Sequence, residues 1–262
     1  MAYETILYEA TDGVARITLN RPEAGHAVNL ALAHELLEAS INASEDPDVR
    51  AVILDASGTV FGFGGDLKYF ESQSDRIGAC LKETTAYFHA AVSRLHRLNS
   101  PVVVAVQGMA AGAGFSLSLI GDIVLAAKSA QFKMAYTAAG LSPDGSSSYF
   151  LPRVVGMRRA MELMLTNRTL SADEAQDWGI VTRVVEDDDL ADEATKLAQR
   201  FAKGPTRAYG GVKRLLASSF QQSVEAQMED ETRTIAELAQ TEDGREGLDA
   251  FLNKRKPNFK GR

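Results

Sequence analysis

The stretch from Leu98 to Ile120 carries no charged residue, so it must be buried in a membrane or in a protein core. It is long enough to span a bilayer, and Gly108-x-x-x-Gly112 matches a motif of paired membrane helices. However, the stretch opens with the largely β-branched run 101–106, breaks at Gly108 and continues with more glycines and serines. This order predicts a buried strand, a tight loop and a buried helix rather than a membrane span.

The same order of strand, glycine-rich loop and helix recurs along the first part of the chain. Strands are expected at residues 14–19, 50–56 and 102–106, and helices at 77–98 and after Asn29, which is a good N-cap. The recurrence predicts an α/β fold whose loops gather at one end of the strands.

Beyond about residue 155 helical patterns dominate, with one short strand expected at 180–185. Ser171 and Glu174 have the spacing of a capping box. We therefore expect an α/β core over residues 1–200 and a helical C-terminal region over residues 201–262.

Composition excludes several classes of function. The net charge of −7, with no basic stripe, argues against a nucleic-acid partner. Cys80 is the single cysteine and cannot form an intramolecular disulfide. The N-terminal residues show no secretory signal pattern, so a cytoplasmic location is expected.

The glycine-rich loops do not match nucleotide-binding motifs. GFGGD and GMAAGAG lack the G-x-G-x-x-G order, and no P-loop lysine follows them. What such loops offer is unshielded backbone N–H groups, and two N–H groups that converge on one point would form an oxyanion hole.

The side chains that could carry chemistry are few. Ser116 lies in GFSLS, which is not a nucleophile elbow, and the four histidines form no metal-binding motif, so no metal site is expected. His89 lies in an apolar helix, where a buried, hydrogen-bonded histidine is the usual outcome. Asp144 lies in a Pro-Asp-Gly turn ahead of a helical stretch, so it could be a turn and helix cap or a chemical base.

Three segments in order resemble the crotonase superfamily, also called the enoyl-CoA hydratase/isomerase family. They are FGFGGDL at 61–67, the stretch 101–127 and the stretch 140–181. The resemblance implies a spiral of repeated β-β-α units and a helical C-terminal trimerisation region. It also implies a homotrimer or a hexamer built as a dimer of trimers, and an acyl-CoA substrate with no cofactor beyond its coenzyme A.

The resemblance also implies the roles of particular residues. The thioester carbonyl would be held by the backbone N–H groups of Gly65, which follows Gly64, and of Ala113, which follows Gly112. The side chains expected to contact substrate in addition are Phe63, Asp66, Leu67, His89, Ser116 and Tyr136.

The hydratases of this family add water with two glutamates, and the matching positions here are Ser116 and Tyr136. Neither can do carboxylate chemistry, so hydration is disfavoured. Asp144 falls where the isomerases have their single base. The resemblance therefore implies an acyl-CoA isomerase that shifts a double bond by Asp144-mediated proton transfer, with Tyr136 orienting the acyl group or donating a hydrogen bond.

Two alternatives stay open. Residues 155–170 are similar to the 4-chlorobenzoyl-CoA dehalogenase branch, in which Asp144 would be a nucleophile and His89 would activate water, although Tyr136 replaces a tryptophan of that branch. The chain could also be an inactive CoA-binding or assembly subunit. A further departure is Gly25, because the family usually carries Arg or Lys there near the CoA phosphates; His26, Arg21 or the basic tail of a neighbouring subunit are candidate replacements.

Overall fold

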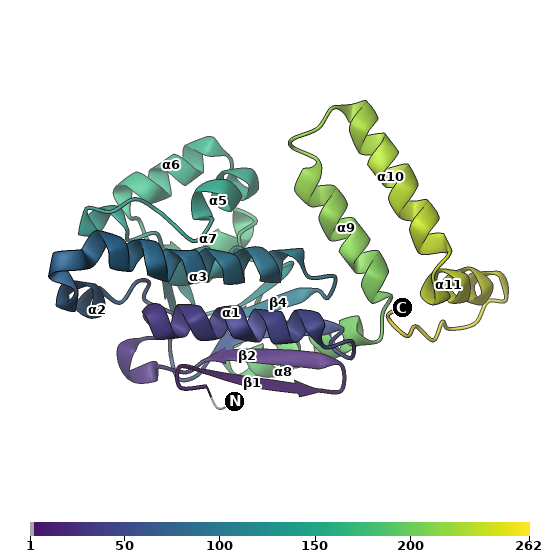
Figure 1. The fold of residues 1–262 in the computed structure, drawn as a ribbon, viewed down its shortest axis with the longest axis horizontal. Helices are drawn as coiled ribbons and strands as arrows, with labels where there is room; N and C mark the ends of the chain where they lie inside the picture. The colour runs from purple at the N-terminus through teal and green to yellow at the C-terminus, as the bar shows by residue number, and fades with distance from the viewer. Residues whose placement is uncertain (1–2) are drawn as a thin grey trace.

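The computed structural model describes residues 3–262, and its centre is a six-stranded sheet in the order β1-β2-β3-β4-β6-β9 (Figure 1). The first two strands are antiparallel and all later neighbours are parallel. The strands are β1 (Ile6–Thr11), β2 (Val14–Leu19), β3 (Ala51–Ala56), β4 (Val102–Val106), β6 (Ile123–Ala127) and β9 (Arg183–Val185).

A second, smaller sheet has the order β5-β7-β8, with β5 at Met109–Ala111, β7 at Gln131–Lys133 and β8 at Leu170–Ser171. Isolated parallel bridges join Gly62 to Ala110 and Val28 to Gly65, in line with this sheet. Successive turns of the chain thus supply a strand to the large sheet, then an extended segment to the small sheet or its bridges, and then a helix. This arrangement confirms the predicted spiral of β-β-α units.

Helices cover the large sheet and close the spiral. Helices α1 and α3 pack against each other, and α8 packs across β3 and β4. As predicted, the Asn29 side chain caps α1 by accepting from Leu32 N at 2.9 Å, and Ser171 and Glu174 form a capping box. The core helices are α1 (Leu30–Glu45), α2 (Leu67–Ser72), α3 (Ile77–Arg97), α4 (Ala113–Ser118), α5 (Ser147–Val155), α6 (Met157–Thr166), α7 (Ala172–Asp177) and α8 (Leu190–Ala202).

The uncharged stretch forms the predicted buried strand and buried helix, but the segment expected to be a loop also contains the short strand β5, which pairs with β7. Strand β4 is buried along its whole length, as expected for a parallel strand covered on both faces, and α4 is fully buried. No helix within residues 3–262 is long and apolar enough to cross a membrane.

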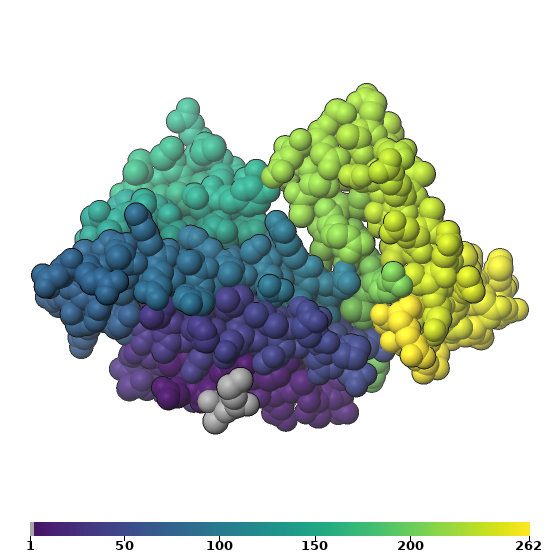
Figure 2. All heavy atoms as spheres, viewed as in Figure 1, coloured from purple at the N-terminus to yellow at the C-terminus, as the bar shows by residue number. Residues whose placement is uncertain are grey.

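The last three helices form an arm that projects from the core, seen at the right of Figures 1 and 2. They are α9 (Thr206–Ser218), α10 (Val224–Ala239) and α11 (Glu242–Leu252). Helix α10 has no buried residue, although Val224, Met228 and Ile235 are large and apolar. An apolar surface of this kind normally packs against a partner.

Two details differ from the sequence expectations. The strand predicted at 180–185 is shorter, and it is not alone beyond residue 155, because β8 pairs Leu170 with Phe132. Leu170 is fully buried, and this burial rather than a local strand pattern holds the pair together. The predicted boundary at residue 200 falls in the last turn of α8, and the division into two domains stays a prediction.

Candidate active site

The glycine-rich loop after β3 and the glycine-rich segment that runs from β5 into α4 meet so closely that side chains would not fit between them. A Cβ on Gly114 would lie 2.4 Å from the carbonyl oxygen of Gly62, and one on Gly112 would lie 3.2 Å from the Cα of Gly64. Real Cβ atoms do not approach backbone at the first of these distances. Glycine is therefore required for the contact between the loops.

This contact brings the backbones of residues 65 and 113 to one cavity. Gly65 lies directly after the contact on one loop, and Ala113 is the first residue of α4, where an N–H has no acceptor inside the helix. Neither residue donates a loop hydrogen bond from its N–H within residues 3–262. Both N–H groups are thus available for a ligand.

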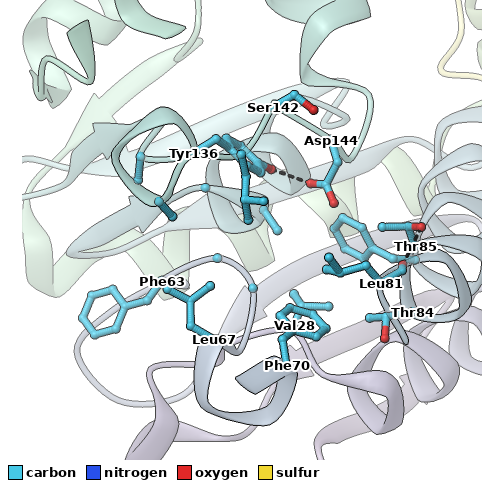
Figure 3. Close-up of a pocket in the computed structure, with 18 residues that line it drawn as sticks. Val28, Phe63, Leu67, Phe70, Leu81, Thr84, Thr85, Tyr136, Ser142 and Asp144 are labelled. Atoms are coloured by element: carbon cyan, nitrogen blue, oxygen red, sulfur yellow. Dashed lines mark hydrogen bonds between the residues drawn. The ribbon is translucent and has the colours of Figure 1, made fainter. Parts of the chain in front are cut away.

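The cavity has a volume of about 290 Å³ and a largely apolar wall (Figure 3). Of the predicted contacts, it is lined by Phe63, Gly64, Leu67, Gly112 and Tyr136, together with Gly65, Ala113 and Asp144. We call this cavity the acyl pocket, because the resemblance would place the acyl group of a substrate there. The residues predicted from the two loops and from the segment around Asp144 therefore meet in space.

Asp144 is held by a short chain of hydrogen bonds. The Tyr136 hydroxyl donates to Asp144 Oδ1 at 2.6 Å, and the Ser116 hydroxyl lies 2.8 Å from the Tyr136 hydroxyl. Burial, followed by the adjoining Asp144 carboxylate, raises the pKa of Tyr136, so this phenol stays protonated and can only donate to the carboxylate. Ser116 is fully buried behind Tyr136 and does not line the acyl pocket.

The Asp144 side chain does not cap the helix that follows. Its backbone carbonyl accepts from the N–H of Ser147 at 3.2 Å and from the Ser147 hydroxyl at 2.8 Å. The carboxylate is instead bound to Tyr136 at the pocket wall (Figure 3). The main chain of Asp144 thus forms the turn, while its carboxylate lies at the pocket wall.

His89 lies on the other side of Asp144. Its Nε2 accepts the backbone N–H of Gly145 at 3.1 Å. The imidazole is exposed rather than buried, and it lines a second cavity of about 890 Å³ between α3, α5 and α9. Asp144 lines this cavity too, so it separates an apolar acyl pocket from a more polar space.

Asp66 has a structural role in this chain. Its carboxylate caps α2 by accepting from Tyr69 N at 3.0 Å and forms a 3.0 Å ion pair with Arg21. It is not among the residues that line the acyl pocket.

The candidates for a CoA phosphate contact near Gly25 are occupied within the chain. Arg21 is paired with Asp66, and His26 is 1% exposed and uses both ring nitrogens, accepting from Arg21 N and meeting Ser57 O at 2.8 Å. Because burial lowers the pKa of His26, this imidazole is neutral near pH 7.

Gly25 lacks a side chain for a clear packing reason. It has a left-handed backbone with φ of 56°, and an added Cβ would lie 2.2 Å from the ring of Phe63. Phe63 is itself 54% exposed at the pocket. An aromatic ring thus takes the space that a basic residue at position 25 would need.

Part of the pocket wall was not predicted. Four residues of α3 line it, and their spacing of i, i+3, i+4 and i+7 is that of one helix face: Leu81, Thr84, Thr85 and Phe88. That periodicity was visible in the sequence, but it cannot tell which cavity the face borders. Val28, Phe70, Ala135, Ala139, Leu141 and Ser142 complete the wall, and only the folded loops bring them there.

The chain matches the family model described as Enoyl-CoA hydratase/isomerase over residues 9–262. It is 39% identical to a "Probable enoyl-CoA hydratase" of Rhodobacter capsulatus over 100% of both chains, and 38% identical to a 1,2-epoxyphenylacetyl-CoA isomerase of Escherichia coli over 99% of both. It is also 37% identical to a 4-chlorobenzoyl coenzyme A dehalogenase of an Arthrobacter species, covering 88% of this chain and 84% of that protein.

Solved structures agree with the fold. The crystal structure of an enoyl-CoA hydratase from a Polaromonas species superposes with a TM-score of 0.93 at 30% identity, covering 97% of this chain and 99% of that one. The protein therefore belongs to the enoyl-CoA hydratase/isomerase family, the crotonase superfamily, and is an acyl-CoA enzyme of that family.

Proposed function

We propose that the protein is an acyl-CoA isomerase that moves a double bond from the β,γ position into conjugation with the thioester. One observation carries the proposal: Asp144 is the only carboxylate that lines the acyl pocket within residues 3–262. A single base is sufficient to take a proton from one carbon and return it to another.

In this mechanism the thioester oxygen accepts the N–H groups of Gly65 and Ala113. Asp144 removes a proton from Cα, and the electron pair of that C–H bond forms an enolate on the oxygen between the two donors. The protonated Asp144 then gives the same proton to Cγ, and the double bond moves from β,γ to α,β. No proton is gained or lost overall, so no cofactor is needed beyond the coenzyme A of the substrate.

The two N–H groups would supply much of the rate acceleration. Donors fixed where negative charge develops cost no reorganisation during the reaction, and the loss of one such donor typically costs about 3 kcal/mol of barrier. The close contact between the two glycine segments, which leaves no room for a Cβ on Gly114, supports donors that are fixed in advance.

Hydration of a conjugated enoyl-CoA is disfavoured, because the two positions that would need carboxylates hold a serine and a tyrosine. Ser116 is buried out of the pocket, and Tyr136 is a protonated donor already engaged with Asp144. Neither can activate water. The identity with the Escherichia coli isomerase supports this choice, whereas the Rhodobacter relative bears the name of a hydratase.

A second candidate is nucleophilic catalysis on an aryl-CoA, with Asp144 attacking the ring and His89 activating water to free the product. It is favoured by the polar cavity that His89 and Asp144 share, and by the identity with the Arthrobacter dehalogenase. However, His89 Nε2 already accepts the N–H of Gly145, so that nitrogen is not free to take a proton from water. The contact fits the isomerase better, because that mechanism needs no histidine to activate water.

The test is a panel of three substrates given to the wild type. A β,γ-enoyl-CoA reports isomerisation by ultraviolet absorbance, a conjugated enoyl-CoA reports hydration, and 4-chlorobenzoyl-CoA reports chloride release. We expect isomerisation to be the fastest of the three. Faster hydration or chloride release would reject the proposal, and failure to bind any acyl-CoA in calorimetry would favour the inactive assembly subunit.

The finer expectations on assembly and location belong to the same proposal. A homotrimer, or a hexamer of two trimers, is supported by the arm whose α10 has no buried residue in the single chain. A cytoplasmic location is supported by the single cysteine, Cys80.

A further inference from the structure

The peptide unit that joins Asp144 to Gly145 is held at both of its polar ends. Its carbonyl oxygen accepts from the N–H and the hydroxyl of Ser147, and its N–H donates to Nε2 of His89 at 3.1 Å. We propose that His89 is a positioning residue: its unprotonated Nε2 fixes this peptide unit and thereby aims the Asp144 carboxylate into the acyl pocket.

The geometry explains why one hydrogen bond controls the carboxylate. The Cα of Asp144 is bonded directly to this peptide plane, so a rotation of the plane swings the side chain. Tyr136 holds one carboxylate oxygen, Oδ1, but it cannot by itself set the direction from which the chain arrives. A misplacement of about 1 Å can cost on the order of 100-fold in rate.

Gly145 leaves its N–H no easy alternative. The residue is buried with φ of 58°, and an added Cβ would lie 2.8 Å from both Phe88 and Ser116. Without the imidazole, a buried donor would lose its protein partner. The segment would then relax, and the carboxylate would move with it.

The same contact makes the aim of Asp144 sensitive to acid. An imidazole nitrogen accepts a hydrogen bond only while it is unprotonated, and a protonated Nε2 would oppose the N–H of Gly145 with a second donor. His89 is exposed, so protons reach it from solvent. The titratable and charged groups around the shared cavity are Asp144 and Tyr149 on the α5 side, His96 and Arg97 on α3, and Lys213 and Arg214 on α9.

The inference rests on the proposed function, and two variants separate its parts. In His89→Gln the side-chain carbonyl can still accept the N–H but does not titrate, whereas His89→Leu removes the acceptor. His34→Gln, on an exposed histidine of α1, is the matched control for the same substitution away from the site.

We expect His89→Leu to lower kcat by 10-fold to 100-fold with KM changed less than about threefold, because aim rather than binding is lost. His89→Gln should keep kcat within about threefold of the wild type and lose less of it toward acid pH, because an amide oxygen accepts the N–H without competing protonation. Wild-type kcat and an unchanged pH profile in His89→Leu would overturn the inference. A His89→Gln variant as inactive as His89→Leu would also overturn it and would favour the water-activating histidine.

Nuclear magnetic resonance tests the same contact without any substrate. The ¹⁵N shifts of His89 should report a proton on Nδ1 and none on Nε2, and the Gly145 amide should shift as His89 is protonated. A proton on Nε2 at neutral pH would refute the inference even if the isomerase assay succeeds. Conversely, absence of isomerase turnover with the expected tautomer present would reject the proposed function and leave the contact standing.

Discussion

At the scale of single residues, the hydrogen bonds from Ser116 through Tyr136 to Asp144 have one possible direction. A carboxylate can only accept, so the Tyr136 hydrogen points to Asp144, and the Tyr136 oxygen then accepts from Ser116. Ser116 and Tyr136, which the resemblance matches to the glutamates of the family's hydratases, thus hold the Asp144 carboxylate of another loop by hydrogen bonds. Under the proposed function, these two side chains support a single base instead of activating water.

Removal of the Tyr136 hydroxyl should therefore impair catalysis more than binding. We predict that Tyr136→Phe lowers kcat for isomerisation about 10-fold, with KM nearly unchanged, because the carboxylate loses one of its anchors while the ring still packs. Steady-state kinetics beside Tyr8→Phe, on the distant β1, provide the comparison. An equal fall in kcat for both variants would reject a specific role for Tyr136.

His26 makes stability depend on pH. Burial lowers its pKa in the folded protein, so below the unfolded value of about 6.5 the unfolded chain binds more protons than the folded one. The free energy of unfolding should thus fall as the pH is lowered through that value. His96, whose pKa burial also lowers, adds to the slope.

The variant that tests this is His26→Asn, because Asn tolerates the left-handed backbone at this position, where φ is 54°. Urea unfolding between pH 5 and 8 should show a shallower loss of stability toward acid in the variant than in the wild type. Equal slopes would show that His26 does not contribute.

At the scale of elements, the contact between the two glycine loops determines the site. The sequence predicts strands, helices and the exposed N–H groups, because glycine patterns and apolar periodicity are local signals. It could not predict that Gly62 faces Gly114, that Phe63 fills the space over Gly25, or that the α3 face from Leu81 to Phe88 borders the pocket. These features depend on contacts between segments far apart in sequence, which no local pattern encodes.

Disruption of the contact between Gly62 and Gly114 should lower the free energy of unfolding. We predict that Gly114→Ala destabilises the protein by about 1–3 kcal/mol, since its Cβ would meet the backbone of Gly62 at 2.4 Å. The variant that does fold should also have a lower kcat than the wild type. Gly78→Ala is the matched control, because nothing lies within 4 Å of its Cβ and alanine favours a helix. Similar unfolding midpoints for the two variants would contradict the packing argument.

At the scale of the whole molecule, the arm of α9, α10 and α11 is the part whose apolar surface the single chain does not cover. Its apolar side chains on α10 recur at helical spacing and face no core: Val224 is 65%, Met228 53% and Ile235 70% exposed. The core, by contrast, buries most of its central strands β3 and β4. An assembly that covers the arm would complete the molecule.

The assembly should break when that stripe is made polar. We predict that the wild type elutes with the mass of three or six chains of 28.3 kDa, and that Met228→Asp combined with Ile235→Asp shifts it toward smaller species. Light scattering coupled to gel filtration measures both, with Glu229→Gln, at a polar position of the same helix, as the control. A monomeric wild type would contradict the account.

The central claim, that Asp144 is the base, is tested most directly by Asp144→Asn, with turnover of a β,γ-enoyl-CoA and acyl-CoA affinity measured on the same preparation. Asparagine keeps the size of the side chain and removes its basicity. The account predicts that kcat falls by about 10³-fold, within the usual range for loss of a general base, while the dissociation constant from calorimetry changes less than about threefold. Turnover at the wild-type rate in Asp144→Asn would show that another group moves the proton.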